Sequence, residues 1–517
     1  MPNSTVIPGL LLGGVTASFL YSWYTSQSKL PLPPGPNGHL IFGSALEVRD
    51  AEVYWIKFAE YSKQYGPIIA VRMLHKQMIV LSDPHLISEL FEKRAAAYSN
   101  RRVTPMIKLI GWERNIVFLP YGPSHKRHRT LLHRALNSRV APEYIPLQQH
   151  ETRRFMRRLL ENPGQFMEHV HLMGASISIR IAYGYKVQST DDRFVESAEK
   201  FMAWLSDVTR PGRWMVDLFP ALRYLPAWFP LASFHHWAQF LKDFTVGHEN
   251  EPFEYVLDQM AKGIAEDSFT SRLLQSEDGQ PVDEETKVFV KGLASDLYSA
   301  GSDTTVSGVQ SFFLAMTLYP DVQAKAQAEI DAYLSQRPTD SSDSRMILPS
   351  DRLNLPYTSA LAREVLRWHP IVNMIGRFTG NEDDSILVSE GLPSVQACNF
   401  YIRASRDILH NPDVYEEPER FVPERFLTAN PPPEPENYTF GFGRRICPGT
   451  HIAHQSMWIA ISNTLVNFTV TKAKDVNGSE IIPEERYSLG PISHPLPFMC
   501  SIKPREGCEK WLRDVEE

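Results

Sequence analysis

The chain has 517 residues, of which 43% are hydrophobic and 22% charged, with a formal net charge of -7 and a pI of about 6.2. This composition is typical of a globular protein with a large core, and the slightly acidic balance gives no support for a nucleic-acid partner. The four cysteines are too few and too scattered for a disulfide framework, and the lack of CxxC and HExxH motifs argues against a zinc site.

The N-terminal segment, residues 1–28, contains no charged side chain. Within it, Val6 to Tyr24 is mostly apolar, ends in aromatic residues suited to a bilayer interface and is followed by Lys29. Because a spanning helix needs about 20 apolar residues, we expect a single-pass membrane anchor with the body in the cytosol. A cleaved signal peptide and a merely buried helix are the alternatives. In the anchored orientation, the N-glycosylation sequon that begins at Asn3 lies outside the cytosol.

Residues 29–49 follow as a proline-rich hinge. Its PLPPGP run, Pro31 to Pro36, cannot form a regular helix or a central strand and favours extended polyproline II, although an ordinary loop is the simpler alternative. No internal repeat occurs in the rest of the chain, so we expect residues 50–517 to form one domain.

The body is predicted to be mainly α with small β-sheets. Apolar residues recur mostly at helical spacing, and runs with strand character are short. The clearest helical patterns cover Pro84–Tyr98, Pro142–Leu160, Glu249–Ile264 and Pro320–Leu334, and the strand patterns cover Ile68–Met73, Gln77–Ser82 and Phe498–Ile502.

The longest helical pattern begins at the acidic run Asp283-Glu284-Glu285 and stops at Pro320, which predicts a helix about 54 Å long. Its middle reads AGSDTT, Ala300 to Thr305, and these are poor helix formers. A loosened turn here would let a ligand approach the backbone, and a threonine can bond back to a carbonyl one turn earlier. Two helices joined by a turn are the alternative.

Downstream, a helix over Tyr357–His369 carries Glu364 and Arg367, which share a face because they are three residues apart. A second arginine, Arg425, follows in the sequence PERF. Although a solvated surface pair is the usual explanation, a glutamate held by two arginines can also fix the position of a loop.

Near the C-terminus, the sequence FGFGRRICPG places Cys447 on a glycine-rich loop just before a helical pattern. The residues alone leave four roles open for this cysteine, namely a disulfide partner, a zinc ligand, a nucleophile or a haem ligand.

The ordered series AGSDTT, EVLR, PERF and FGFGRRICPG resembles the cytochrome P-450 haem-thiolate monooxygenases over about residues 30–510. The cysteine-loop pattern of that family, F-x-x-G-x-R-x-C-x-G, is met by Phe440, Gly443, Arg445, Cys447 and Gly449. The resemblance implies the cytochrome P-450 fold, a haem domain over residues 50–517, haem b as cofactor and Cys447 as the axial ligand of its iron. The N-terminus of a helix stabilises a thiolate, and a thiolate ligand donates electron density to the iron. Both properties agree with that role.

By the same resemblance, Arg445, Arg377 and Arg129 hold the haem propionates, and Gly443 lets the backbone approach the porphyrin. His125 stands where the family usually has tryptophan, and it can also donate a hydrogen bond to a propionate.

The AGSDTT run corresponds to the oxygen-activating turn of the family. The resemblance implies that Asp303 and Thr304 relay the protons that dioxygen reduction consumes, and that Thr305 is structural. It also makes Glu364, Arg367 and Arg425 a structural cluster on the haem side.

One segment departs from the family pattern. Between Asp384 and Asp407 the usual Pro-Lys-Gly turn between two strands is missing. We therefore expect either a remodelled sheet on the substrate side or an error in the translated gene.

The resemblance implies an endoplasmic reticulum enzyme that takes electrons from NADPH–cytochrome P-450 reductase. The basic run from His125 to Arg139 suits an acidic donor, although a solvated helix face would look the same. The C-terminal sequence is similar to that of fungal members, many of which serve secondary metabolism. We expect a pocket formed by Leu297–Thr304, Ile371–Ile375 and Pro491–Ser493, whose mostly apolar character predicts a hydrophobic small-molecule substrate.

Two other functions are considered. One is a reductase-independent haem-thiolate isomerase or dehydratase that uses peroxides, and the other is a degenerate, non-catalytic haem-binding protein.

Overall fold

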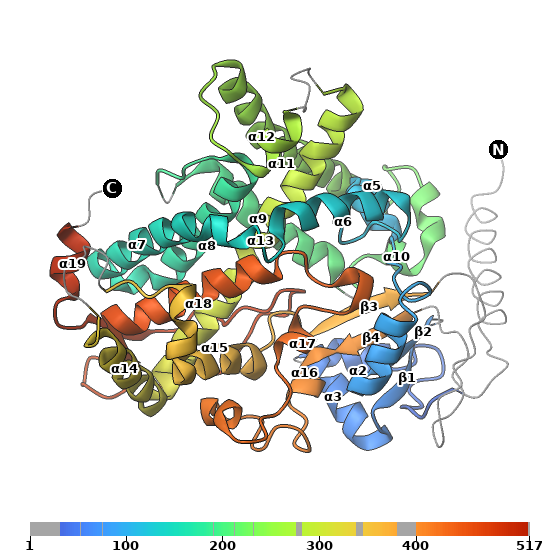
Figure 1. Cartoon of the computed structure of the whole chain (residues 1–517). Coiled ribbons are helices and arrows are strands. Elements are labelled where there is room, and N and C mark those ends of the chain that lie inside the picture. The colour runs from blue at the N-terminus through green and yellow to red at the C-terminus, as the bar shows by residue number, and fades with distance from the viewer. Residues whose placement is uncertain are drawn as a thin grey trace, which may run out of the picture. The chain divides into compact units, whose positions relative to one another are not determined.

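The computed structural model describes residues 32–51, 53–74, 76–189, 191–210, 212–230, 232–275, 282–337, 345–379 and 400–514. The chain divides into two compact units, and many of their elements are labelled in Figure 1. Unit 1 consists of Met1–Arg102, Asn373–Ile408 and Phe442–Arg445, and unit 2 of Val103–Val372, Leu409–Gly441 and Ile446–Glu517.

Unit 1 is built on a four-stranded sheet in which the strand order is β1-β2-β4-β3. The strands β1 (Ile68–Met73) and β2 (Lys76–Leu81) form an antiparallel hairpin, β2 pairs in parallel with β4 (Phe400–Ala404), and β4 pairs antiparallel with β3 (Met374–Phe378). The unit also contains the helices α2 (Ala45–Asp50), α3 (Tyr54–Tyr65) and α4 (Pro84–Ser88), a π-helical turn at Glu89–Lys93, and most of α16 (Ser405–Leu409).

The core of unit 1 forms where α3 covers the sheet. Phe58 and Tyr61 of α3 are buried with Ile69, Val71 and Val80 of the hairpin. Val48, which lies within the segment predicted to be the hinge, joins the same cluster. The last residues of that segment therefore form part of α2 and pack in unit 1.

Residues 380–399 lie outside the described residues, and they include most of the segment that departs from the family pattern. On either side of them, β3 and β4 pair in register, Met374 with Ala404 and Phe378 with Phe400. β3 therefore precedes the unusual segment, and β4 lies within the last part of it.

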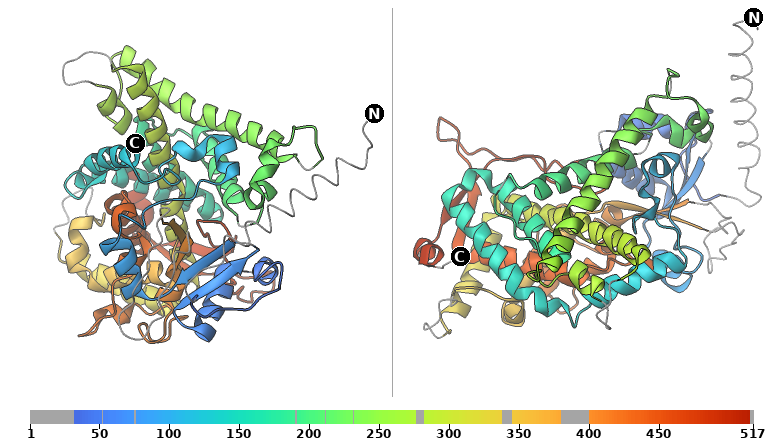
Figure 2. Two further views of the ribbon diagram at one scale, coloured as in Figure 1. Left: turned by 90° about the vertical axis from the view of Figure 1, so that its right-hand side faces the viewer. Right: turned by 90° about the horizontal axis from the view of Figure 1, so that it is seen from above.

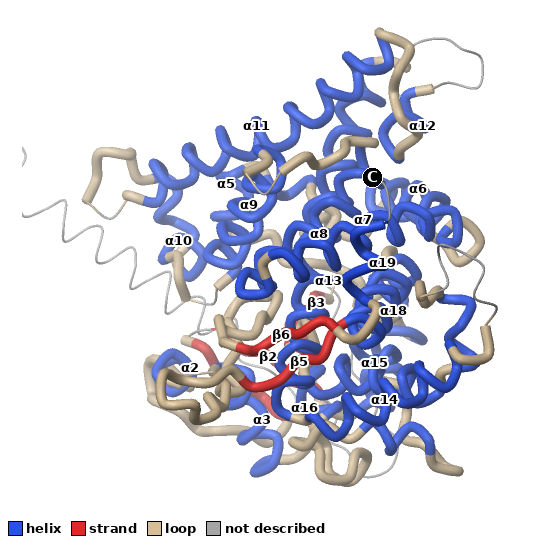
Figure 3. Tube along the Cα trace, turned by 90° about the vertical axis from the view of Figure 1, so that its left-hand side faces the viewer, coloured by secondary structure: helices blue, strands red, loops and turns tan. Residues whose placement is uncertain are grey.

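Unit 2 is mainly helical, and Figure 2 shows its helices from two further sides. They are α5 (Pro105–Ile110), α6 (Pro123–Leu136), α7 (Ile145–Glu161), α8 (Phe166–Tyr183), α9 (Arg193–Thr209), α10 (Met215–Leu218), α11 (Phe234–Ala261), α12 (Phe269–Leu274), α13 (Glu284–Leu318), α14 (Pro320–Leu334), α15 (Pro356–Trp368), α17 (Glu436–Thr439), α18 (Thr450–Asn467) and α19 (Cys508–Asp514). Its antiparallel strands β5 (Phe468–Lys472) and β6 (Cys500–Pro504) lie side by side in Figure 3.

The helix α13 is the central element of unit 2. Its N-cap Asp283 accepts a hydrogen bond from the backbone N–H of Thr286 at 2.7 Å, two glutamates occupy the first turn, and Pro320 starts the next helix. The helix is continuous for 35 residues. The alternative of two helices is therefore wrong, and so is the loosened turn, because Ala300–Thr305 stay α-helical.

Two glycines let α8 and α13 approach closely. A Cβ atom on Gly301 would lie 2.5 Å from Ser178 Oγ of α8, and one on Gly174 would lie 2.6 Å from Val306 Cγ2 of α13. The glycine of AGSDTT therefore makes room for a neighbouring helix.

Most other sequence predictions are confirmed within a turn. The predicted Pro142–Leu160 helix is α7, and Pro320–Leu334 is α14. The predicted start at Glu249 was wrong, because α11 begins at Phe234 and contains Pro252 in its interior.

Within the described residues, no helix combines the length and apolar character needed to span a bilayer. The predicted anchor, residues 1–28, lies outside those residues.

Candidate active site

The predicted oxygen-activating turn lies in the middle of α13, where Asp303 and Thr304 are both partly buried. The Thr304 hydroxyl donates a hydrogen bond to the carbonyl of Ala300 at 2.9 Å, as expected for a threonine in a helix. The Asp303 Oδ1 atom lies 3.1 Å from Nε2 of His494. We did not predict His494 from the sequence, because it comes from a loop near the C-terminus.

The loop that carries His494 is tied to α13 and to the segment after α15. Ser307 of α13 donates to the carbonyl of Ser493 at 2.6 Å, and the N–H of Ser493 donates to the carbonyl of Ile371 at 2.9 Å. The side chain of Ser493 also lies 3.0 Å from His369 Nε2. These bonds join two of the three segments that were predicted to line the substrate pocket, Ile371–Ile375 and Pro491–Ser493, and tie them to α13 three residues beyond the third segment.

The glycine-rich loop before α18 passes from unit 2 into unit 1 and back. Gly441 belongs to unit 2, Phe442–Arg445 to unit 1, and the chain re-enters unit 2 at Ile446. Because Arg445 and Cys447 are only two residues apart, the peptide chain alone keeps the predicted propionate ligand close to the predicted iron ligand.

In unit 2, Cys447 lies just ahead of the N-terminus of α18. Its N–H donates to the carbonyl of Phe440 at 2.8 Å, and Thr450 Oγ1 donates to the carbonyl of Cys447 at 2.8 Å. Burial raises the pKa of the Cys447 thiol, while the N–H of Gly449, the positive charge of Arg129 and the Thr450 side chain act in the opposite direction. Burial is the largest of these effects, and the three neighbouring groups offset it in part by favouring the anionic form of the thiol.

The helix α6 contributes the other two predicted groups of unit 2. Arg129 Nη1 donates to the carbonyl of Ile446 at 2.6 Å, and burial lowers the pKa of this guanidinium. His125 is 2% exposed, and its ring lies 5.7 Å from that of Tyr121. The α6 segment thus places Arg129 beside the cysteine loop, and it buries the histidine that replaces the expected tryptophan.

In unit 1, Arg445 and Arg377 are anchored by backbone carbonyls. Arg445 Nε donates to the carbonyl of Ser99 at 2.8 Å, and Arg377 Nη2 donates to that of Phe442 at 3.2 Å. Gly443 has a left-handed φ of 53°, and a Cβ atom on it would lie 2.0 Å from the carbonyl oxygen of Phe91. The fold itself therefore requires glycine at position 443, whatever the cofactor.

The chemistry of these residues fits a haem. A partly buried thiol at a helix N-terminus is a soft ligand for iron, and cationic side chains suit the carboxylates of the propionates. Among the described residues, no cluster of histidine, cysteine or acidic side chains forms an alternative metal site.

The predicted structural cluster is confirmed in unit 2. Arg367 donates to both oxygens of Glu364, at 2.8 and 2.9 Å, and Arg425 Nε lies 3.2 Å from the same carboxylate. Glu364 and Arg367 are completely buried, and Arg367 also donates to the carbonyl of Pro418. The carboxylate therefore joins α15 to the segment that leads towards the cysteine loop.

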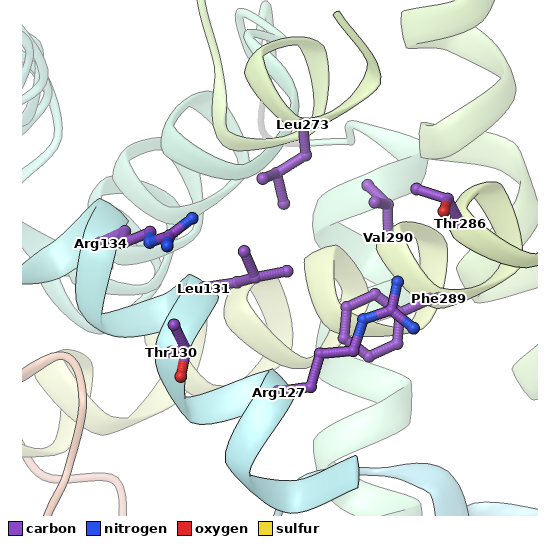
Figure 4. A pocket seen from close by; sticks show the side chains of 8 residues that line it. All are labelled: Arg127, Thr130, Leu131, Arg134, Leu273, Thr286, Phe289 and Val290. Atoms are coloured by element: carbon purple, nitrogen blue, oxygen red, sulfur yellow. The ribbon is translucent and has the colours of Figure 1, made fainter. Parts of the chain in front are cut away.

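The basic run of α6 does not form one patch. Arg129 bonds to the cysteine loop, whereas Arg127 and Arg134 line a hollow of about 410 Å³ on another side of the helix, shown in Figure 4. There the Arg127 guanidinium lies 4.2 Å from the centre of the Phe289 ring. This hollow contains none of the predicted site residues.

Comparison with known proteins gives a consistent result. Residues 33–498 match the family described as Cytochrome P-450. Cytochrome P-450 monooxygenase 208 of Postia placenta is 37% identical over 488 residues, which cover 93% of this chain and 91% of the relative. Cytochrome P-450 monooxygenase claR of Ampulloclitocybe clavipes is 35% identical over 522 residues, covering 99% and 93%. Cytochrome P-450 monooxygenase CLM2 of Gibberella zeae is 33% identical over 507 residues, covering 96% and 93%.

Proposed function

Because the chain belongs to the cytochrome P-450 family of haem monooxygenases, we propose that Cys447 is the thiolate ligand of a haem b iron. The observation that carries this proposal is the position of Cys447 at the N-terminus of α18, next to Arg129 and Thr450. When bound, the haem supplies the site for reductive activation of dioxygen. A thiolate ligand favours cleavage of the O–O bond.

The cationic side chains around the cysteine loop bind and orient the cofactor. Arg445, Arg377 and Arg129 provide positive charge for the two propionates, and His125 donates a hydrogen bond in place of the usual tryptophan. A charge-assisted bond from a guanidinium is stronger than one from a neutral donor.

Asp303 and Thr304 move protons. Insertion of one oxygen atom into a substrate consumes one dioxygen, two electrons and two protons, and it releases the second oxygen atom as water. A carboxylate connected to solvent, next to a hydroxyl group, can supply those protons. The hydroxyl of Thr304 is held by the carbonyl of Ala300, so it keeps a fixed position on the helix.

We assign the enzyme to hydroxylation or epoxidation of a hydrophobic small molecule in fungal secondary metabolism, with electrons from NADPH through cytochrome P-450 reductase. The fungal origin of the relatives and the apolar residues around Ile371 support this assignment. Residues 1–28 anchor the protein in the endoplasmic reticulum membrane with the catalytic body in the cytosol, and Asn3 is available for glycosylation.

The reduced, carbon monoxide-bound difference spectrum of the full-length protein tests the ligand. The wild type is expected to show the long-wavelength band of a thiolate-ligated haem, and Cys447→Ser to lose it. The same band in Cys447→Ser would refute the assignment, and Cys500→Ser is the matched control. Product formation that needs no NADPH would show an isomerase or dehydratase instead.

A further inference from the structure

The structure assigns a role to His494, a residue outside every motif used above. We propose that His494 is a proton-relay residue of the monooxygenase reaction, which passes protons to Asp303 from the side of His171. This inference rests on the proposed proton transfer by Asp303 and Thr304.

The contact between His494 and Asp303 has the geometry of proton transfer. His494 Nε2 and Asp303 Oδ1 are 3.1 Å apart, and the two side chains are 19% and 15% exposed. This distance is within hydrogen-bond reach, and the partial burial limits competition from bulk water. The relay step moves one proton from His494 Nε2 to Asp303 Oδ1, and it leaves a neutral imidazole and a neutral carboxyl group.

The second nitrogen of His494 faces a side chain that can serve both protonation states. Its Nδ1 atom lies 3.2 Å from Oε1 of Gln310, which is about two turns beyond Asp303 on α13 and 1% exposed. Rotation of an amide presents either its oxygen to a protonated nitrogen or its N–H to an unprotonated one. The Gln310 Nε2 atom makes no other hydrogen bond among the described residues, so this rotation breaks no second bond.

A second imidazole ring, from α8, lies against His494. The ring of His171 stacks on that of His494 with 5.9 Å between centroids and 24° between planes. Burial lowers the pKa of His171, partly offset by the charge of Asp303, so the neutral form of this ring is favoured at neutral pH. Glu168, which is exposed, lies three residues earlier on α8 and shares the same helix face.

The surrounding bonds hold the histidine in place. The preceding residue, Ser493, is completely buried and bonded to α13 through Ser307 and to Ile371. A loop fixed at this point cannot swing His494 away from Asp303 without breaking these bonds. Ser493, Ser307 and Ile371 therefore hold His494 next to Asp303.

The test uses full-length, haem-loaded protein with cytochrome P-450 reductase and NADPH. Four variants are compared with the wild type, namely His494→Gln, Asp303→Asn, the double variant and His236→Gln. The last is a control on an exposed histidine of α11. The rate of NADPH oxidation is measured, together with the amount of hydrogen peroxide released per NADPH.

His494→Gln is expected to slow NADPH oxidation about 10-fold or more, as loss of a positioned acid does. The double variant should be no slower than Asp303→Asn within about twofold, because residues of one relay act as a unit. His236→Gln should match the wild type. A second measurement does not depend on turnover. The thermal midpoints of the three relay variants should be non-additive, since the two side chains are in contact.

Three results would overturn the inference. A wild-type rate in His494→Gln would leave only a structural hydrogen bond, because the glutamine amide can still donate to Asp303 but cannot pass on a proton. If the rate losses of the two single variants multiply in the double variant, the two residues serve separate proton routes. A wild-type rate in Asp303→Asn would refute the proposed role of Asp303 and this inference together, whereas a slow Asp303→Asn with a fast His494→Gln would refute the inference alone.

Discussion

The buried histidine of α11, His248, should make the protein sensitive to mild acid. Its ring bonds to Ser197 and Ser299 and stacks on Phe201 at 4.7 Å, and it is 3% exposed. Burial lowers the pKa of His248 to about 4, from an ordinary value of 6.5. The unfolded chain therefore binds a proton between these two values and the folded chain does not.

The sign and size of the effect follow from that difference. Where the unfolded state binds more protons, the free energy of unfolding falls as the pH is lowered. At a pH below both pKa values, this histidine lowers the free energy of unfolding by about 3 kcal/mol relative to neutral pH, because the two pKa values differ by about 2.5 units. Between about pH 6.5 and pH 5, the free energy of unfolding falls by about 1.5 kcal/mol through this histidine alone.

The substitution His248→Gln should remove this pH-dependent part of the free energy of unfolding. At neutral pH the variant is expected to be less stable by about 1–2 kcal/mol, because the stacked ring is lost. On acidification it should then lose about 1.5 kcal/mol less than the wild type. Urea unfolding, followed by tryptophan fluorescence at several pH values, measures both the stability at neutral pH and its loss on acidification. An unchanged pH dependence would refute the reasoning, and His236→Gln on the same helix is the control.

Three further substitutions test the packing around the site. Glu364→Gln should lower the free energy of unfolding by about 3–5 kcal/mol, because it leaves two buried arginines without their counter-charge. Urea unfolding measures this loss, and a loss below about 1 kcal/mol would contradict the expectation. Gly301→Ala should cost about 1–3 kcal/mol through overpacking, and Ser178→Ala in the same chain should restore part of the thermal midpoint if the clash is the cause. Gly443→Ala should lower the haem content of the purified protein, measured by the haem-to-protein absorbance ratio, because a Cβ atom meets the carbonyl of Phe91. A full haem complement would show that the loop can shift.

The sequence predicted the parts of the fold that have local signals. The limits of α13 follow from a capping aspartate at one end and a proline at the other. The start of α11 was missed because Pro252 looks like a first-turn residue, although the helix tolerates it in its interior. The cluster around Glu364 could be predicted only through the ordered motifs, because a single E-x-x-R pair does not tell a buried site from a surface one.

The contacts of Asp303 and Gly301 could not be predicted from the sequence. The pairing of Asp303 with His494 depends on how a C-terminal loop folds back onto α13, and no local pattern marks it. The sequence also could not tell whether Gly301 makes room for a ligand or for a helix, and the structure shows Ser178 in that place. Nothing in the sequence near His494 points to a carboxylate partner.

The sheet of unit 1 has a consequence for the synthesis of the chain. The inner edge of β2 pairs with β4, whose residues leave the ribosome more than three hundred positions after Leu81. At about 5–20 residues per second, the hairpin waits roughly 15–60 seconds with one strand edge unpaired. An unpaired edge is a template for joining other chains. The amount of protein recovered should therefore depend on the speed of translation between β2 and β4 and on the chaperones present during that interval.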